Sequence, residues 1–170
     1  MANPSFEPIV LKSNMTLVLD GAHLTLAEGT FTNMFRADFV TNVTLVGRNG
    51  ATADGGVYNG LGEKTAKALS KPIWLNNTLL FTNVKGFRVE GIRFVNQRWW
   101  ALNFIGCSQG VIRNLDFLAN HETVFPDGTV TNVVSRRWQG RPKVRNADGV
   151  DIRCGCHDIL IENITGFTQD

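Results

Sequence analysis

The sequence has few of the features that mark helical, membrane-spanning or nucleic-acid-binding proteins. Stretches rich in Ala, Leu, Glu and Lys are almost absent, and no apolar run is long enough to cross a membrane. The net charge is only +2 at pH 7, which does not indicate nucleic acid as a partner. The opening residues, MANPSFEPIVLKSN, lack the basic and apolar regions of a signal peptide. We therefore expect no membrane or nucleic-acid partner, and a cytoplasmic location unless a segment precedes this sequence.

Cysteine is also scarce, with three residues at Cys107, Cys154 and Cys156. Three thiols leave one over from any pairing, and Cys154 and Cys156 are too close in sequence for an ordinary disulfide, so free buried thiols are favoured. A structural zinc site needs four ligands, and no second Cys or His pair stands at a supporting spacing. The sequence therefore predicts no metal site and no cofactor.

Residues typical of β structure are abundant instead. Gly and Asn are frequent, as are Val, Ile, Thr and Phe, and 43% of the residues are apolar. A chain of 170 residues with this composition is expected to form one globular domain. We expect residues 1–170 to form that domain, with residues 119–145 as an irregular insertion or loop.

A short motif recurs along the chain as VEGIRF (89–94), IRNLDF (112–117) and IENITG (161–166). The first two copies are 23 residues apart, and the third follows after 49 residues, which allows either two further coils or one coil with a long insertion. Short strands that recur at such a period predict a parallel β-helix. The competing interpretation is a β-sandwich, in which turn signals recur about every 8 to 12 residues.

The alignment of these copies predicts two columns of side chains through the stacked coils. The first column holds small buried residues, each five positions before an aligned apolar residue: Val84, Cys107 and Cys156. The second lies at bends, where asparagine tolerates a left-handed backbone and can bond its neighbours: Asn83, Asn114 and Asn163.

Two aspartates are separated by almost one such period. Asp148 and Asp170 are 22 residues apart, so coils about 4.8 Å apart would make their carboxylates neighbours. Glycosidases use paired carboxylates, separated by about 5 to 5.5 Å for retention and about 6.5 to 9.5 Å for inversion. Repulsion within such a pair raises the pKa of one member, which provides the acid. The alternative is that Asp148 is an ordinary turn residue and Asp170 a solvated terminal one.

Further candidates surround Asp148. Asp151 has the opposite strand parity from Val150 and Ile152, so we expect it to face solvent beside Asp148, as a substrate contact or as a plain exposed charge. The segment 136–145 holds five basic residues, and arginine is suited to bidentate binding of carboxylates. A uronic-acid polymer is thus one hypothesis for the ligand, with a solvated loop as the alternative.

Within that basic segment, Arg141 and Arg145 are the candidate substrate contacts, and Trp138 could stack on a sugar ring. Trp99 and Trp100 could stack in the same way. The alternation of Trp100 with Leu102 and Phe104 predicts instead that Trp100 lies in the core.

Several segments together resemble the polygalacturonase family, glycoside hydrolase family 28: NVTLVGRNGATADGG, KPIWL, VEGIRFVNQRWWALNFIGC, NADGVDI and ENITGFTQD. Asn146-Ala147-Asp148-Gly149 resembles the family's Asn-Thr-Asp motif, and Gln169-Asp170 resembles the start of its Asp-Asp motif. The resemblance implies a right-handed, single-stranded parallel β-helix of the pectin-lyase type. It also implies inverting hydrolysis of α-glycosidic bonds in a uronic-acid-containing polysaccharide, with Asp148 activating water and Asp170 as general acid.

The sequence also departs from the family. The second Asp of the Asp-Asp motif is missing, and so are the later Gly-His-Gly and Arg-Ile-Lys motifs; His121 and His157 match neither. We therefore expect a fragment, incomplete at the C-terminal and N-terminal ends, that carries part of the site and is inactive in isolation. The alternative function is that of a non-catalytic β-helix, which binds polysaccharide or serves as a structural surface or tail-fibre module.

Overall fold

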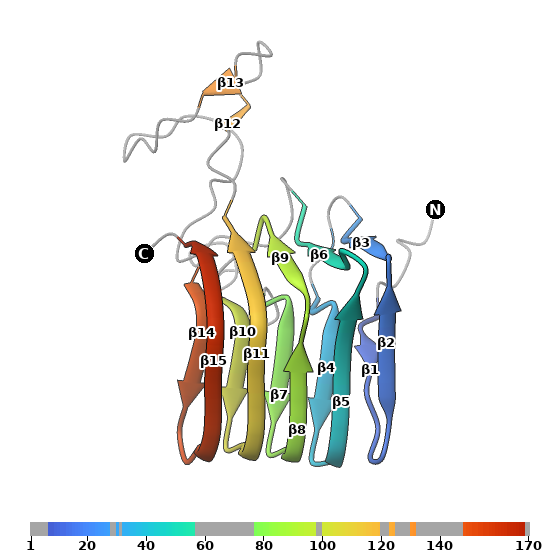
Figure 1. Cartoon of the computed structure of the whole chain (residues 1–170), viewed down its shortest axis with the longest axis vertical. Coiled ribbons are helices and arrows are strands. Elements are labelled where there is room, and N and C mark those ends of the chain that lie inside the picture. The colour runs from blue at the N-terminus through green and yellow to red at the C-terminus, as the bar shows by residue number, and fades with distance from the viewer. Residues whose placement is uncertain are drawn as a thin grey trace, which may run out of the picture.

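The computed structural model describes residues 7–27, 30, 32–56, 77–97, 100–119, 123–124, 130–131 and 148–168. These residues form an all-β structure dominated by two parallel sheets, as expected from the composition (Figure 1). No helix that could cross a membrane is found among them.

The first sheet, called sheet A here, is parallel throughout and has five strands in the described part of the chain. Its strands, in spatial order, are β1 (Ile9–Val10), β4 (Phe35–Asp38), β7 (Leu79–Thr82), β10 (Trp100–Ile105) and β14 (Asp148–Arg153).

The second sheet, sheet B, consists of two parallel stacks that merge at long strands. One stack holds β2 (Thr16–Asp20), β5 (Thr41–Arg48) and β8 (Lys85–Glu90). The other holds β3 (His23–Thr25), β6 (Thr52–Asp54) and β9 (Arg93–Val95). The long strands are β11 (Ser108–Leu118), which pairs with both β8 and β9, and β15 (His157–Phe167), which pairs with β11.

The predicted insertion at 119–145 lies mostly outside the described residues. Two of its short segments, β12 (Thr123–Val124) and β13 (Val130–Thr131), pair with each other in the antiparallel direction.

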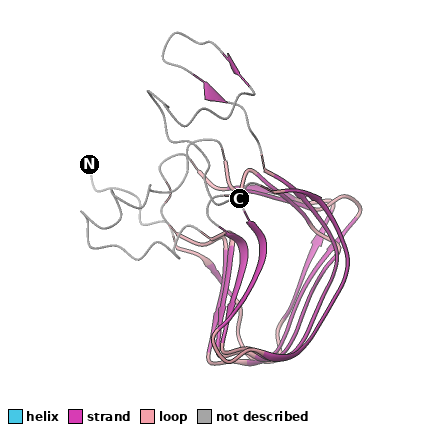
Figure 2. Ribbon diagram, turned by 90° about the vertical axis from the view of Figure 1, so that its left-hand side faces the viewer, coloured by secondary structure: helices cyan, strands magenta, loops and turns pink. Residues whose placement is uncertain are grey.

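The chain passes alternately through the two sheets, and each passage stacks on the previous one. A rung is defined here as one strand of sheet A with the strand or strands of sheet B that follow it. In the end-on view the described rungs superpose, with the core enclosed between the two sheets (Figure 2). Every strand of these two sheets therefore has the equivalent strand of the adjacent rung as its hydrogen-bonded partner.

The register confirms the sequence repeat. Ile112 pairs with Val89 on one side and with Ile161 on the other. The 23-residue period is therefore one rung, and the 49-residue step is also one rung, with a long insertion. The β-sandwich interpretation is wrong, because both large sheets are parallel and sandwiches of that kind are built from antiparallel strands.

The core is formed by the inward-facing residues of every rung. Five phenylalanines are almost fully buried, at 0–2% exposure: Phe35, Phe81, Phe94, Phe104 and Phe117. Phe81 and Phe104 pack edge to face, with ring centroids 5.5 Å apart, and Phe94 stacks on Phe117 at 5.7 Å. Burying each such side chain contributes roughly 1.5–3 kcal/mol, which makes these five phenylalanines a main source of stability.

The asparagine bends are confirmed. Asn83, Asn114 and Asn163 have φ angles of 51°, 53° and 51°, in the left-handed region. The Nδ2 of Asn163 donates a hydrogen bond to the Oδ1 of Asn114 at 3.0 Å, so the two bends are tied across adjacent rungs. Asparagine suits these positions because it tolerates a left-handed backbone and because its side-chain amide can both donate and accept a hydrogen bond.

The cysteine column is confirmed for its two lower members. Val84 and Cys107 are fully buried, and Cys156 is half-buried against the core. The backbone N–H of Cys107 donates to the Sγ of Cys156 at 3.2 Å. Burial raises the pKa of the Cys107 thiol to about 11, so this thiol stays protonated at neutral pH and acts as a small apolar side chain. All three thiols are free, as predicted, but Cys154 is exposed.

Two glycines with a similar backbone angle differ in how closely an adjacent rung approaches them. Gly91 has φ +72°, and a methyl group there would collide with the backbone oxygen of Gly47 in the adjacent rung. Gly50 has a similar φ of +80° but nothing within 4 Å of the corresponding position. Comparing alanine substitutions at Gly91 and Gly50 therefore distinguishes the free-energy cost of an unfavourable backbone angle from that of a steric collision.

We expect Gly91→Ala to lower the free energy of unfolding by about 2–4 kcal/mol, because strain of the backbone adds to displacement of the neighbouring rung. Gly50→Ala should cost only about 1 kcal/mol, since it adds backbone strain alone. Urea denaturation followed by circular dichroism measures both. Equal losses in the two variants would contradict the close contact between rungs.

Candidate functional site

The candidate site lies on the outer face of sheet A, where β14 adds to β10. Register pairs Leu102 with Val150 on the core side and Asn103 with Asp151 on the opposite side. Asn103 in turn pairs with Leu80 of β7. In the described part of the chain, Asp151 therefore lies at the end of a register column whose residues differ in character from rung to rung: Val10, Arg36, Leu80, Asn103 and Asp151.

Asn103 belongs to a buried amide cluster on this face. The Nδ2 of Asn103 donates to the Oδ1 of Asn77 at 2.9 Å, and the Nδ2 of Asn33 donates to the backbone oxygen of Asn77 at 2.7 Å. All three side chains are fully buried. Hydrogen-bonded amides in a buried setting are rigid, so the cluster gives Asp151 a fixed neighbour.

Asn103 was not among the site candidates from the sequence, although the alternating segment Leu102-Asn103-Phe104 can be aligned with Val150-Asp151-Ile152. The signal was present in that alignment, because it places an amide beneath the carboxylate of Asp151.

The two described aspartates of the site both lie on β14. Asp148 is the first residue of the strand, half-buried, and pairs with Trp100 of the rung below. Asp151 is also half-buried, and its Oδ2 atom is buried. The sequence predicted that Asp151 faces solvent, and the structure leaves its side chain partly accessible with one carboxylate oxygen buried.

Trp100 is not a core residue, contrary to the alternation with Leu102 and Phe104. It is half-buried, and the guanidinium of Arg153 lies 4.5 Å from the centre of its ring. A cation over an indole face is worth about 0.5–1 kcal/mol at an exposed site, which helps to hold the ring at the surface. Arg153 was not a candidate from the sequence, although it shares the parity of Asp151 on the same strand.

The remaining candidates fall outside the described residues. These are Asp170, Arg141, Arg145 and Trp138. The structure thus brings Asp148 and Asp151 together on one strand and adds Asn103, Trp100 and Arg153 to their surroundings. Among the described residues, no group of His, Cys, Asp and Glu is arranged to hold a metal ion.

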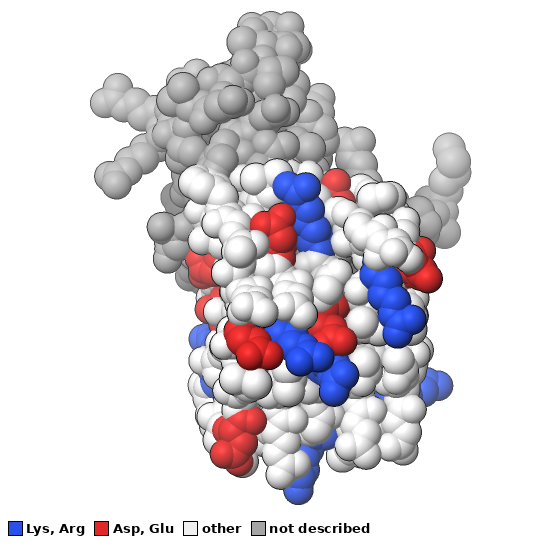
Figure 3. Space-filling model, in the orientation of Figure 1, with Lys and Arg blue, Asp and Glu red and all other residues white. Residues whose placement is uncertain are grey.

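Several charged side chains on the face of sheet B form ion pairs between rungs. Acidic and basic side chains are interspersed over the face seen in Figure 3. The Nε of Arg113 lies 2.6 Å from Glu90 of the rung below, and its Nη1 lies 3.7 Å from Glu162 of the rung above. Hydrogen bonding to Glu90 raises the pKa of Arg113 above its ordinary value. Arg93 and Asp116 form a similar cross-rung pair at 2.9 Å. These pairs link rungs and do not form a cluster of one sign, so sheet B is a weaker ligand surface.

Comparisons with known proteins show the fold. No protein-family model matches the sequence, and no curated protein sequence matches it. A crystal structure of a proposed glycosyl hydrolase from Parabacteroides merdae ATCC 43184 matches 94% of this chain and 77% of its own, with a TM-score of 0.57 and 12% sequence identity. The chain therefore shares an all-β fold with that protein over nearly its whole length.

The pairing of position 103 with Asp151 can be tested with a second carboxylate. In Asn103→Asp, a buried carboxyl beside Asp151 would have a folded-state pKa above its unfolded value of about 3.9. The variant's stability relative to wild type should therefore fall as the pH rises above about 4, by roughly 2 kcal/mol or more at pH 7. Urea unfolding at pH 4 and pH 7 measures the difference.

The double variant Asn103→Asp/Asp151→Asn removes the repulsion between the two carboxylates and should recover that part of the pH-dependent loss, while the part caused by burial of a carboxylate at position 103 remains. A loss that is the same at both pH values, or that the exchange leaves unchanged, would show that these side chains do not face each other.

Proposed function

We propose that this chain is a right-handed parallel β-helix of the pectin-lyase type that forms part of a polygalacturonase-like glycoside hydrolase. The alternating passage through two parallel sheets, rung on rung, supports the architecture. The likeness to a proposed glycosyl hydrolase over 94% of the chain supports the class of activity.

The observation that carries the proposal is that Asp148 and Asp151 lie on one strand, β14 of sheet A. Asp148 pairs in register with Trp100, whose ring contacts Arg153, and Asp151 pairs with the buried Asn103. Carboxylates, an aromatic ring and a guanidinium close together are side chains suited to binding an acidic sugar polymer. The parallel strands of the sheet also offer an elongated surface along the stack, which suits a linear polymer.

The proposed chemistry is inverting hydrolysis. Asp170, as general acid, protonates the glycosidic oxygen of the leaving group, while Asp148 removes a proton from the water that attacks the anomeric carbon on the opposite face. Such a mechanism needs about 6.5–9.5 Å between the carboxyl groups, to leave room for water. A separation of one rung, about 4.8 Å, together with a small offset along the strands allows that distance.

The proposed substrate is a uronic-acid polysaccharide. The guanidinium of Arg153 is exposed on the outer face and has the geometry to bind a sugar carboxylate in a bidentate manner. Arg141 and Arg145 are proposed as further contacts of this kind, and Trp138 as a ring on which a sugar stacks. Asp151, whose Oδ2 atom is buried, is proposed to bind a sugar hydroxyl with its other oxygen.

We expect Asp148→Asn in the full-length protein to reduce the release of reducing ends from polygalacturonate by about 100-fold or more, because the amide cannot act as a base. The matched control is Asp158→Asn, at an exposed position on β15 of the same rung, which should retain wild-type activity. Equal rates for Asp148→Asn and wild type would remove Asp148 from the mechanism.

The second candidate is a non-catalytic β-helix that binds polysaccharide or serves as a structural module. Its support is the continuous ladder of ion pairs and amide bonds from rung to rung, which any rod-like β-helix requires regardless of activity. This candidate predicts that polygalacturonate binds equally well to wild type and Asp148→Asn, and that neither protein releases reducing ends.

A further inference from the structure

Phe39 has the greatest exposure, 79%, among the exposed large apolar residues in the described part of the chain. It lies in the bend between β4 and β5, and these bends form the lower edge of the molecule in Figure 1. The backbone N–H of Phe39 donates to the oxygen of Thr82 in the adjacent rung at 2.9 Å, and that of Asn83 donates in the same way to Ile105 at 2.8 Å. Phe39 and Asn83 therefore occupy equivalent bend positions in adjacent rungs.

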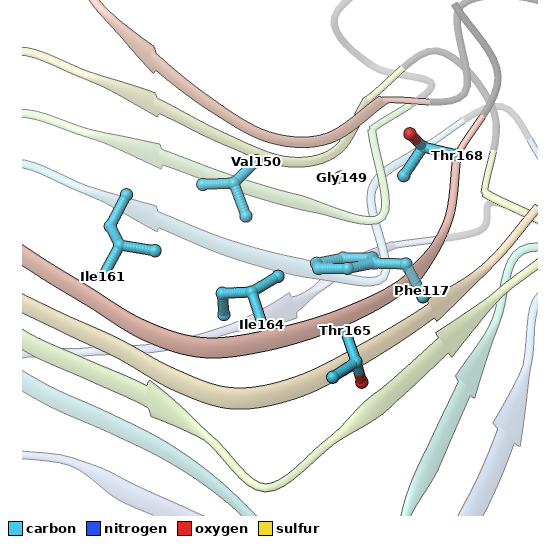
Figure 4. A pocket seen from close by; sticks show the side chains of 8 residues that line it. Phe117, Gly149, Val150, Ile161, Ile164, Thr165 and Thr168 are labelled. Atoms are coloured by element: carbon cyan, nitrogen blue, oxygen red, sulfur yellow. The ribbon is translucent and has the colours of Figure 1, made fainter.

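The exposure of Phe39 belongs to a rung that has neighbours on both sides. β4 lies between β1 and β7, and β5 lies between β2 and β8. Asn83, in the next rung, is exposed at the equivalent position. By contrast, Val150 and Ile164, which line the hollow in Figure 4, continue the inward columns of the core. The exposure of Phe39 is therefore a property of the bend, because the bend points away from the core in stacked rungs.

The backbone of Phe39 is in the left-handed region, with a φ angle of +53°. The equivalent positions of the other rungs hold Asn83, Gly106 and Cys154, with φ angles of 51°, 63° and 26°. Asparagine and glycine tolerate this conformation, whereas a bulky side chain adopts it at a cost. An aromatic ring that is both strained and exposed adds little to the stability of the fold, and such residues are concentrated at functional sites.

Basic side chains from both adjacent rungs flank Phe39. Lys12 comes from the β1 rung, where the register places it beside Asp38. Lys85 comes from the β7 rung and pairs in register with the second residue after Phe39. Both lysines are exposed, and neither forms an ion pair with another described residue, whereas Asp38 is already paired with Arg36. The surroundings of the ring therefore carry a local excess of positive charge.

This combination suits an acidic sugar chain better than a protein partner. Protein partners use contiguous apolar patches, but the bend residues around Phe39 are exposed and polar: Ser13, Thr41, Asn42 and Asn83. A sugar ring needs a flat aromatic face and polar groups for its hydroxyls, and a uronic acid also needs a cation for its carboxylate. Phe39, the neighbouring amides and the two lysines provide these groups.

We propose that Phe39, Lys12 and Lys85 form a second binding site for a uronic-acid polysaccharide, at the bends between sheets A and B. The ring stacks on one sugar, and the lysines bind carboxylates along the chain. The choice of ligand rests on the proposed function, but the location does not, because Asp148 and Asp151 lie on β14. This second site holds a long polymer on the molecule and takes no part in its cleavage.

Affinity electrophoresis of the full-length protein in native gels that contain polygalacturonate tests this site. All proteins carry Asp148→Asn, so that the polymer stays intact. Phe39→Asn should raise the apparent Kd at least about tenfold, because the stacking surface is lost, and Phe39→Trp should bind as tightly as the parent or more tightly. Equal retention of the parent by methyl-esterified polygalacturonate, which is neutral, would overturn the assignment of an acidic ligand.

Two single charge removals from β8 provide the matched control. Lys85→Ala should raise the apparent Kd by about two- to fivefold, as expected for one exposed charge. Arg88→Ala removes the same charge from the face of sheet B, three residues along the same strand, and should bind like the parent. Equal losses in the two variants would overturn the site, because they would show that the polymer responds only to total charge.

Thermal unfolding separates a loss of binding from a loss of the fold. Asparagine tolerates the left-handed backbone, so Phe39→Asn should have a Tm equal to that of the parent or higher. A lower Tm would contradict the proposal, because it would show that Phe39 is retained for the stability of the fold.

Arg153→Ala distinguishes the second site from the site on sheet A. It should weaken binding there and leave the retention that depends on Phe39, which adding Phe39→Asn should then remove. Retention that Phe39→Asn leaves unchanged, or no retention of any protein, would overturn the second site without bearing on cleavage. Retention that is lost in Phe39→Asn but unchanged in Arg153→Ala would support the second site and contradict the role proposed for Arg153.

Discussion

The structure depends on one constraint, which is that each strand of the two large sheets hydrogen-bonds, in parallel and in register, to the equivalent strand of an adjacent rung. Ile112, between Val89 and Ile161, is the simplest case. Because every inward position lies over the same position one rung away, a core residue must suit its neighbours above and below. The stacked phenylalanines, the Cys107–Cys156 contact and the Asn114–Asn163 hydrogen bond all follow from this constraint. In the described part of the chain, β1, β2, β3, β14 and β15 are each paired on one side only.

The same constraint leaves the outer face of sheet A free to vary. Its column from Leu80 through Asn103 to Asp151 changes character at each rung, whereas the inward column beside it stays apolar. A functional site can be placed at positions that vary in this way, because changing them does not disturb the repeated core. Asp151 gains a rigid neighbour there, because the buried Asn77–Asn103 pair has little freedom to move and Asn103 pairs in register with Asp151.

The fold could largely be predicted from the sequence, because period and register are local patterns. The shift between residues 89 and 112 located the rungs, and the left-handed asparagines were found at the expected bends. The site was harder. Strand parity says on which side of a sheet a residue lies, but it does not say whether that side is covered, so the burial of Asp151 and Asn103 was missed. The prediction that Trp100 lies in the core was wrong for a related reason. Alternation along the strand does not reveal that Arg153 contacts the ring at the surface.

The most direct test of the functional account is a crystal structure of the full-length Asp148→Asn protein with an oligogalacturonate that it cannot cleave. The account predicts a sugar chain across the outer face of sheet A, with a water molecule between the amide at position 148 and the anomeric carbon, and a sugar carboxylate bound to Arg153. A sugar chain bound along sheet B, or an outer face of sheet A left empty under saturating ligand, would contradict it.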